Sequence, residues 1–186
     1  TLSEAASSMN VGQASSILWM DAAETYFLLA EAKLRLNLGD KTVKEYYEEG
    51  VKTSFSSKGA SGAESYLDND VNVPSTSFID PTNGRNTDVS RMVSTLTVKW
   101  DESASPDKKL ERIMVQKWIA LFPDGQEAWS EMRRTGYPGI VTINTNASGG
   151  EVATGELISR LKFPTKEYSD NGENTQAAVS LLKGTD

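Results

Sequence analysis

Apolar residues recur at helical spacing in two consecutive segments near the start of the chain. In the first segment, one face would carry Ala23, Tyr26, Phe27, Ala30 and Leu34. In the second, one face would carry Val43, Tyr46, Tyr47, Gly50, Val51 and Phe55. Spacings of three and four residues bring side chains to the same side of an α-helix. The pattern therefore predicts two amphipathic helices within residues 21–56.

Both segments begin at capping signals. Asp21 and Glu24 have the spacing of a capping box, in which the first side chain accepts a backbone N–H and the glutamate reaches back. Thr42 and Glu45 repeat this spacing. The residues Asn37-Leu38-Gly39 are typical of a helix end followed by a turn. We therefore expect an antiparallel helical hairpin.

A single hairpin leaves one of its faces uncovered. Small Ala and Gly residues at the expected crossing, with large aromatics beside them, are typical of a tetratricopeptide unit, which needs neighbours stacked on it. We therefore interpret residues 1–186 as part of a longer protein. A mature N-terminus left by processing is the alternative explanation for a chain that opens at Thr1.

A denser apolar pattern occupies residues 105–136. Ser105-Pro106 marks a helix start. The apolar positions that follow at helical spacing are Leu110, Ile113, Met114, Trp118, Leu121 and Phe122. Because Val115, Ile119 and Ala120 widen this arc, the helix must be covered on more than one side. A second helix should begin at Asp124 and end at Gly136, and we expect Trp118 and Trp129 in the core.

The remaining segments are less regular. Residues 56–105 contain glycines, prolines and an Asn83-Gly84 turn, with a short helix predicted at 63–67 and a weak strand at 91–100. A long irregular segment in a compact domain is usually functional or disordered. Residues 139–186 read as a loop followed by a helix near 174–182, whose inward residues would be Ala177, Ala178, Leu181 and Leu182.

Composition excludes several functions. The chain has 186 residues, enough for one domain with a core, and a net charge of −7. Nucleic-acid binding needs a concentrated basic surface, which this sequence lacks. The absence of cysteine and histidine excludes disulfides, cysteine nucleophiles and a Ser-His-Asp triad. No apolar run is long enough to span a membrane. We expect no cofactor and no metal site.

Charged residues at the helices have structural interpretations. A glycosidase needs two carboxylates that face each other across a cleft, one of them protonated. The carboxylates that we interpret as exposed helix surface or helix caps are Glu111, Glu127 and Glu131. Arg133-Arg134 stands in a last helical turn, where we expect a bridge to carboxylates or to the following turn. An anion clamp is the alternative role for the two arginines.

Aromatic rings in the irregular segment need a reason other than helix packing. Tyr66, Phe78 and Trp100 lie there, and Asn83 and Arg85 stand among them in sequence. Sugars place their apolar C–H faces on aromatic rings, while amides and arginines hold the hydroxyl groups. We predict that these five residues contact a ligand, with Trp100 and Tyr66 as the preferred ring contacts. A small satellite core beneath the loop is the alternative.

Three segments resemble a known family. They are Ala30-Glu31-Ala32 with Tyr46 to Phe55, the long run Gln116 to Pro138, and Arg160 to Pro164 with Glu167 and Asn174. The second segment is the most specific. Together they resemble the C-terminal signature of the SusD/RagB family of nutrient-binding outer-membrane lipoproteins of Bacteroidetes. The chain would then be a C-terminal portion, with hairpins at 21–56 and 105–136, an irregular insertion at 56–105, and a loop and helix at 139–186.

The resemblance implies an all-α protein with tetratricopeptide-like hairpins, long irregular insertions and at most short strands. It also implies a protein that is not an enzyme and is held at the outer face of the outer membrane by a lipid anchor outside these residues. Such a protein binds a glycan or another nutrient and delivers it to a SusC-type TonB-dependent transporter. The alternatives are a tetratricopeptide-like peptide-binding scaffold and a glycoside hydrolase.

Overall fold

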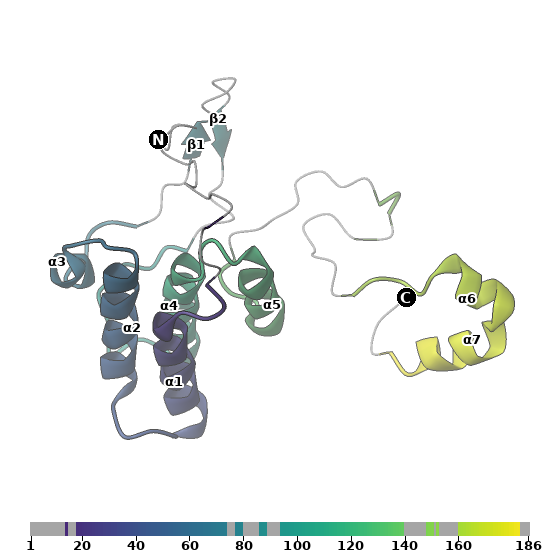
Figure 1. Ribbon diagram of the computed structural model, residues 1–186, viewed down its shortest axis with the longest axis horizontal. Helices are drawn as coiled ribbons and strands as arrows, with labels where there is room; N and C mark the ends of the chain where they lie inside the picture. The colour runs from purple at the N-terminus through teal and green to yellow at the C-terminus, as the bar shows by residue number, and fades with distance from the viewer. Residues whose placement is uncertain are drawn as a thin grey trace. The chain divides into compact units, whose positions relative to one another are not determined.

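The structure is a computed structural model that describes residues 14, 18–73, 77–79, 86–88, 94–139, 148–150, 152 and 160–182, with the backbone alone at 77–79 and 86–88. The chain forms two compact units, residues 1–142 and residues 143–186. Helices dominate the described part of both units (Figure 1), which confirms the expected all-α class.

The elements are short and closely spaced. The first unit contains α1 (Ala22–Leu36), α2 (Val43–Ser57), α3 (Ala63–Leu67), β1 (Ser77–Ile79), β2 (Asn86–Asp88), α4 (Pro106–Ala120) and α5 (Gly125–Thr135). The second unit contains α6 (Thr165–Asp170) and α7 (Gly172–Ser180). β1 and β2 pair in antiparallel register, with Phe78 opposite Thr87. Among the described residues, no helix is both long and apolar enough to cross a bilayer.

α1 and α2 form the expected hairpin, and their caps hold it (Figure 1). The Thr42 box is complete, because Thr42 Oγ1 accepts the amide of Glu45 at 3.2 Å and Glu45 Oε2 accepts that of Thr42 at 2.7 Å. The box predicted at Asp21 is only half right. Asp21 accepts the amide of Ala23 at 3.0 Å, and Glu24 lies 3.4 Å from the Lys117 ammonium instead of reaching back.

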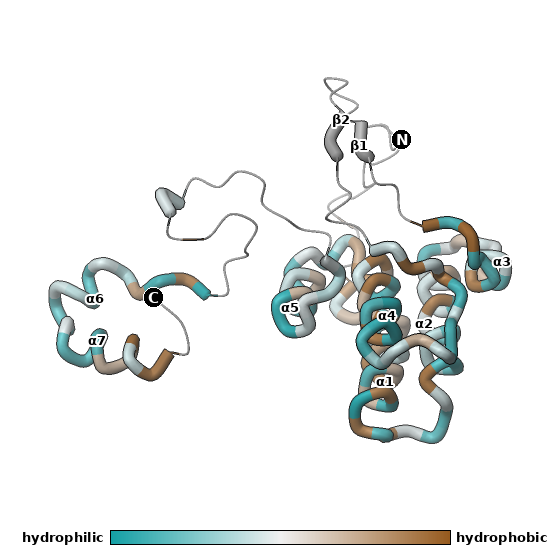
Figure 2. The backbone as a smooth tube through the Cα atoms, turned by 180° about the vertical axis from the view of Figure 1, so that it is seen from behind, coloured by the Kyte–Doolittle hydropathy of each residue, from teal (hydrophilic) through white to brown (hydrophobic). Residues whose placement is uncertain are grey.

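The core lies between α1, α2 and α4. Phe27, Tyr47 and Ile113 are fully buried there. The Tyr47 ring meets Phe27 edge-on, with centroids 6.4 Å apart, and meets Trp100 at 5.2 Å. Gly50 on α2 makes room for this cluster, since a Cβ at that position would lie 2.8 Å from the Phe27 ring. In Figure 2, hydrophobic and hydrophilic residues alternate along these helices as their amphipathic patterns require.

α4 buries one apolar side and exposes another. Its residues Leu110, Ile113 and Met114 belong to the core, as predicted. In contrast, the exposed fractions are 40% for Trp118 and 47% for Ile119 on α4, 63% for Phe122 in the turn that follows, and 40% for Trp129 on α5. The prediction that Trp118 and Trp129 are core residues is therefore wrong. The apolar arc is wide enough for two contacts, and the described residues cover one of them.

The end of the irregular segment is held by side chains. The weak strand predicted at 91–100 is wrong for the described residues 94–100, which adopt no regular structure. Tyr47 Oη donates to the carbonyl of Val98 at 2.6 Å, so a tyrosine hydroxyl, rather than a neighbouring strand, satisfies this backbone group. The short helix predicted at 63–67 is present as α3.

The second unit is a pair of short helices. α7 corresponds to the helix predicted at 174–182, but it begins at Gly172 and is preceded by α6, which is too short to show periodicity. Thr175 is its buried residue, and its hydroxyl donates to the carbonyl of Glu167 at 3.1 Å. Ala177 and Leu181, both predicted to point inward, are exposed, Leu181 by 84%, so that part of the prediction is wrong.

We predict that Gly50→Ala destabilises the protein, although alanine normally favours a helix by about 1 kcal/mol over glycine. The added methyl would press on the Phe27 ring, and overpacking of a core costs roughly 1–3 kcal/mol. Urea unfolding should show a lower free energy of unfolding than the unchanged protein. Gly125→Ala is the control, because a Cβ there meets nothing within 4 Å. A gain in stability from Gly50→Ala would contradict the packing described above.

Candidate functional site

Trp100, one of the predicted ligand contacts, lies against the core. It is 9% exposed, and its indole Nε1 donates to Glu102 Oε2 at 2.6 Å. The Lys109 ammonium lies 5.8 Å from the centroid of the Trp100 ring and 2.9 Å from Glu102. This burial agrees with the packing alternative. A direct ligand contact by Trp100 stays a prediction.

Tyr66, the second preferred ring, is half-buried on α3. Its ring lies 5.2 Å from Phe55 of α2, and its hydroxyl donates to Gln116 of α4 at 3.1 Å. Tyr66 therefore joins α3 to the helical body and keeps part of its surface free. Its role in binding also stays a prediction.

The other predicted contacts lie further along the segment. Phe78 is in β1, where the backbone alone is described. Asn83 and Arg85 lie outside the described residues. The structure thus brings Tyr66 and Trp100 onto the helical body and leaves the placement of the other three side chains undescribed.

The two ends of the irregular segment meet each other. The amide of Lys99 donates to the carbonyl of Asn69 at 3.0 Å, and the Lys99 ammonium lies 3.2 Å from Asp70. Arg112 of α4 donates through Nε to the carbonyl of Thr97 at 3.1 Å. The segment therefore leaves and rejoins the helical body at neighbouring points, beside α3 and α4. This is the arrangement expected of a loop presented by a rigid scaffold.

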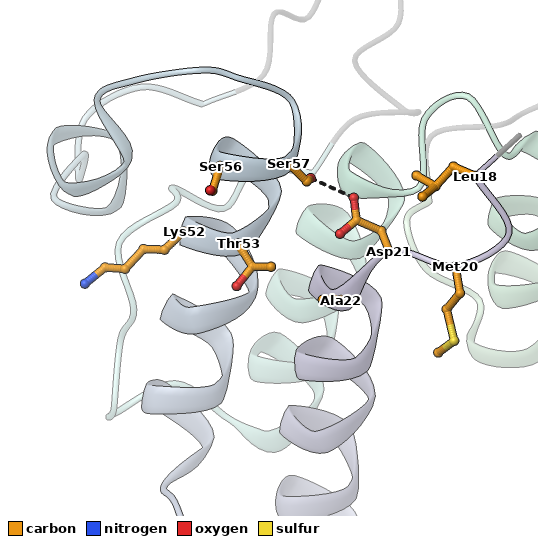
Figure 3. A pocket seen from close by; sticks show the side chains of 8 residues that line it. All are labelled: Leu18, Met20, Asp21, Ala22, Lys52, Thr53, Ser56 and Ser57. Carbon is orange, nitrogen blue, oxygen red and sulfur yellow. Dashed lines mark hydrogen bonds between the residues drawn. The ribbon is translucent and has the colours of Figure 1, made fainter. Parts of the chain in front are cut away.

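A pocket of about 510 Å³ lies where α1 begins and α2 ends (Figure 3). Its lining residues are Leu18, Met20, Asp21, Ala22, Lys52, Thr53, Ser56 and Ser57. The Asp21 carboxylate is already satisfied, because it accepts the amide of Ala23 and the hydroxyl of Ser57 at 2.7 Å. The lining contains no aromatic ring, so it does not offer the stacking platform that sugars prefer.

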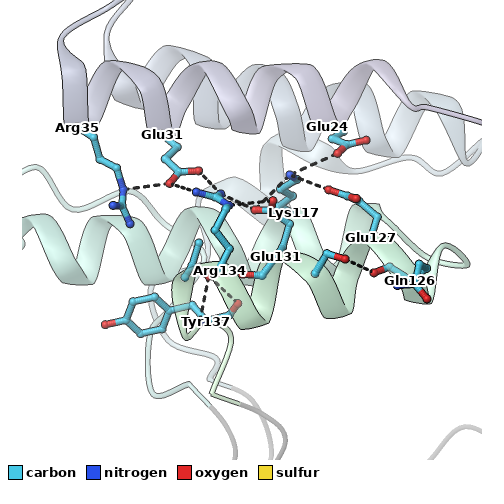
Figure 4. A network of polar contacts seen from close by, with 11 residues as sticks. Glu24, Glu31, Arg35, Lys117, Gln126, Glu127, Glu131, Arg134 and Tyr137 are labelled. Atoms are coloured by element: carbon cyan, nitrogen blue, oxygen red, sulfur yellow. Dashed lines mark hydrogen bonds and ion pairs between the residues drawn. The ribbon is translucent and has the colours of Figure 1, made fainter. Parts of the chain in front are cut away.

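A buried cation joins three helices near the opposite side of α1. Lys117 of α4 is 1% exposed. Its ammonium lies 3.3 Å from Glu131 of α5, 3.4 Å from Glu24 of α1 and 3.9 Å from Glu127 (Figure 4). A buried charge is costly unless it is paired, and here the pairing comes from both neighbouring helices.

Arg134 continues the network, as Figure 4 shows. It donates to both oxygens of Glu31 on α1, at 2.8 and 2.5 Å, and to Glu131 at 2.6 and 3.1 Å. Arg35 adds a contact to Glu31 at 3.0 Å. The expected bridge from Arg134 to carboxylates is confirmed. The interpretation of Glu131 as exposed surface is wrong, because its side chain is 12% exposed and shared by two cations.

Glu111 was also interpreted as exposed surface, and that prediction is wrong too. It is 8% exposed, and its carboxylate accepts from Ser94 at 2.8 Å and from Lys108 at 2.8 Å. Ser94 belongs to the end of the irregular segment, so Glu111 adds a further tie between this segment and α4. Like Lys117, it is a charged residue whose partner is distant in sequence and therefore invisible to a helical pattern.

Two carboxylates, Glu131 and Glu102, are held in their charged form by their partners. Burial alone would raise the pKa of Glu131, but the hydrogen bonds from Arg134 and the charge of Lys117 outweigh it and hold the pKa below its ordinary value. The indole of Trp100 and the ammonium of Lys109 lower the pKa of Glu102 in the same way. Within the described part of the chain, no cluster of His, Cys, Asp and Glu has the makings of a metal site.

Comparison with known proteins identifies the family of the chain. The family model described as "Susd and RagB outer membrane lipoprotein" matches residues 1–186. The chain belongs to the SusD-like family. The family is one of outer-membrane lipoproteins, which confirms the outer-membrane localisation that the resemblance implies. No curated protein matches the chain.

Solved SusD-like structures match at substantial identity. A SusD homologue from Bacteroides uniformis is 41% identical with a TM-score of 0.81, covering 95% of this chain and 36% of its own. A chitin-binding SusD homologue from Flavobacterium johnsoniae is 41% identical with a TM-score of 0.76, covering 91% and 35%. A third from Bacteroides thetaiotaomicron is 40% identical with a TM-score of 0.76. This chain therefore spans little more than a third of the structures it matches.

We predict that Lys117→Met destabilises this SusD-like protein by about 3–5 kcal/mol, because Glu24 would be left buried without a cation and Glu131 would keep only Arg134. Lys44→Met is the matched control. Its exposed pair with Glu48 should contribute within about 1 kcal/mol. The measurement is urea unfolding of both variants, and equal effects would argue against a special role for the buried cation.

The network also predicts a pH dependence. Because the pKa of Glu131 is lowered in the folded state, its contribution to stability is present above its ordinary value of 4.5 and is lost as pH falls through the folded value. The unfolding temperature should therefore drop on acidification below about pH 4.5. Glu131→Gln should have a lower unfolding temperature at neutral pH, and this temperature should fall less on acidification than that of the unchanged protein. An equal fall in both proteins would contradict this role of Glu131.

Proposed function

We propose that this SusD-like protein captures an oligosaccharide or another nutrient at the cell surface and delivers it to a SusC-type TonB-dependent transporter. The observation that carries the proposal is the 41% identity, over 91% of the chain, to a chitin-binding SusD homologue. Chitin oligosaccharides are therefore the first ligands to test.

The electrostatics favour binding without catalysis. Every described carboxyl group whose pKa departs clearly from its ordinary value departs downward, and the groups are Asp40, Glu45, Asp101, Glu102 and Glu131. A glycosidase needs a carboxylic acid that stays protonated to donate to the leaving group, which requires a raised pKa. These five groups are therefore unsuited to the role of that protonated acid.

We place the ligand at the irregular segment, with Tyr66, Phe78, Asn83, Arg85 and Trp100 as its contacts. Tyr66 and Trp100 would act from the base of the segment, because both are held by α2 and α4. Phe78, Asn83 and Arg85 would supply further contacts. Binding residues on a loop that a rigid scaffold presents are a common arrangement.

The test measures binding by the complete protein with isothermal titration calorimetry on chitin oligosaccharides, other oligosaccharides and peptides, and checks for products by chromatography. A saturable response to one glycan without cleavage is the expected outcome. Cleavage would favour a glycoside hydrolase, and a response to peptides alone would favour a scaffold. Delivery is tested separately, by co-purification with the transporter.

The contact residues are tested by Phe78→Ala and Arg85→Ala. Each change is expected to weaken glycan binding by about tenfold, which corresponds to roughly 1.4 kcal/mol. Phe122→Ala is the control, since Phe122 is a 63% exposed phenylalanine in the turn after α4. Trp100 is changed to Phe rather than Ala, because removal of the packed ring would unfold its surroundings. Unchanged affinity in both loop variants would move the ligand away from this segment.

A further inference from the structure

The second unit contains a pocket that is separate from the irregular segment. It lies where α6 meets α7, the helical pair near the C-terminus in Figure 1, and its volume is about 510 Å³. Small-molecule sites in proteins usually have volumes of roughly 300–1,000 Å³. The lining comes from the residues before α6, from both helices and from the residue between them. The pocket is therefore large enough for a ligand and is built within this unit alone.

An aromatic ring forms one wall of the pocket. Phe163 lines it, and Pro164 comes next in the chain, which restricts the Phe163 backbone to extended conformations. The Arg160 guanidinium lies 4.7 Å from the centroid of the Phe163 ring. A guanidinium stacked on a ring covers one of its two faces. The ring is thus held in place from one side, and its remaining surface can contact a ligand in the pocket.

The other walls carry polar groups that hydrogen bonds orient. Asn174 Nδ2 donates to Asn171 Oδ1 at 2.7 Å. This bond leaves the Asn171 amide nitrogen able to donate and the Asn174 amide oxygen able to accept. Glu167 adds a carboxylate on an exposed side chain. The buried Thr175 hydroxyl donates to the carbonyls of Glu167 and Asn171, at 3.1 and 2.9 Å, and so joins the two helices beneath these groups.

A ring beside both donors and acceptors fits the chemistry of a sugar. A sugar has apolar C–H groups, which pack on aromatic rings, and hydroxyl groups, which both donate and accept. A wholly apolar ligand would remove water from the amides and the carboxylate without replacing their hydrogen bonds, which is unfavourable. The lining contains one carboxylate and no cation. Charge repulsion therefore disfavours uronic acids and sulfated sugars.

We propose that this pocket is a second carbohydrate site, which binds one neutral sugar residue of a glycan. The apolar face of the sugar lies on Phe163, and its hydroxyl groups bind Glu167, Asn171 and Asn174. The inference rests on the proposed function for the class of ligand, and it adds a binding site outside the irregular segment.

Saturation-transfer difference NMR on the complete protein tests the pocket. The neutral probes are N-acetylglucosamine, glucose and galactose, and the acidic probe is glucuronate. Phe163→Leu keeps an apolar side chain and removes the ring, whereas Asn174→Ala removes an exposed amide. Gln176→Ala is the control, because Gln176 is an exposed amide of α7 outside the pocket lining. The unfolding temperature of each variant shows whether it is folded.

We expect saturable binding of at least one neutral sugar and weaker binding of glucuronate. Asn174→Ala should weaken the neutral sugar by roughly twofold to tenfold, the effect of one lost hydrogen bond. Phe163→Leu should weaken it by a similar factor, because the ring contact is lost. Gln176→Ala should leave the affinity unchanged. If Phe163→Leu fails to fold, the exposed Asn174 position decides the result.

Three outcomes would overturn the proposal. They are no binding of any neutral sugar, equal affinities in the unchanged protein and Asn174→Ala, and glucuronate binding as tight as that of the neutral sugars. Binding that is lost in Phe78→Ala and Arg85→Ala but retained in the pocket variants would assign the sugar to the irregular segment alone. That result would remove the second site and support the proposed function. A glycan that binds the complete protein nowhere would contradict both.

Discussion

The packing of the first unit depends on a buried charge that must be paired. Lys117 is buried among carboxylates from α1 and α5, so the three helices must come together in one register for the ammonium to be compensated. Removing water from such a group is unfavourable by several kcal/mol unless the pairing is complete. Arg134 completes it by holding Glu31 and Glu131 at once. Ion pairing therefore specifies how α5 sits on α1, while apolar packing specifies how α2 and α4 do.

This arrangement separates structure from binding. The buried carboxylates serve the scaffold, because each is paired with a cation or a hydrogen-bond donor of the helical body. The irregular segment is carried at the edge of the scaffold, tied through Val98, Thr97 and Ser94 to α2 and α4. The helical body and the irregular segment are thus separate parts of the first unit, and the second is the proposed binding region.

Local rules predicted much of the fold. The caps at Thr42 and Ser105, the end of α1 at Asn37 and the small residue Gly50 under an aromatic ring all follow from neighbours in sequence. The failures share one cause. Whether Trp118 faces a partner, and whether Glu131 faces water, depends on residues far away in the chain. Periodicity cannot distinguish a core stripe from a second stripe, and the predicted site fell on a segment with little periodicity at all.

The hydrogen bond between the Lys99 amide and the Asn69 carbonyl has a consequence for how this family can diversify. It closes residues 70–98 into a loop whose two ends are already fixed side by side. The entropy of such a closure grows only slowly with length, by about 0.6 kcal/mol for each doubling. Insertions and deletions between these anchor points are therefore nearly free of thermodynamic penalty. Under the proposed function, the length of the binding segment can therefore change while the helices beneath it stay the same.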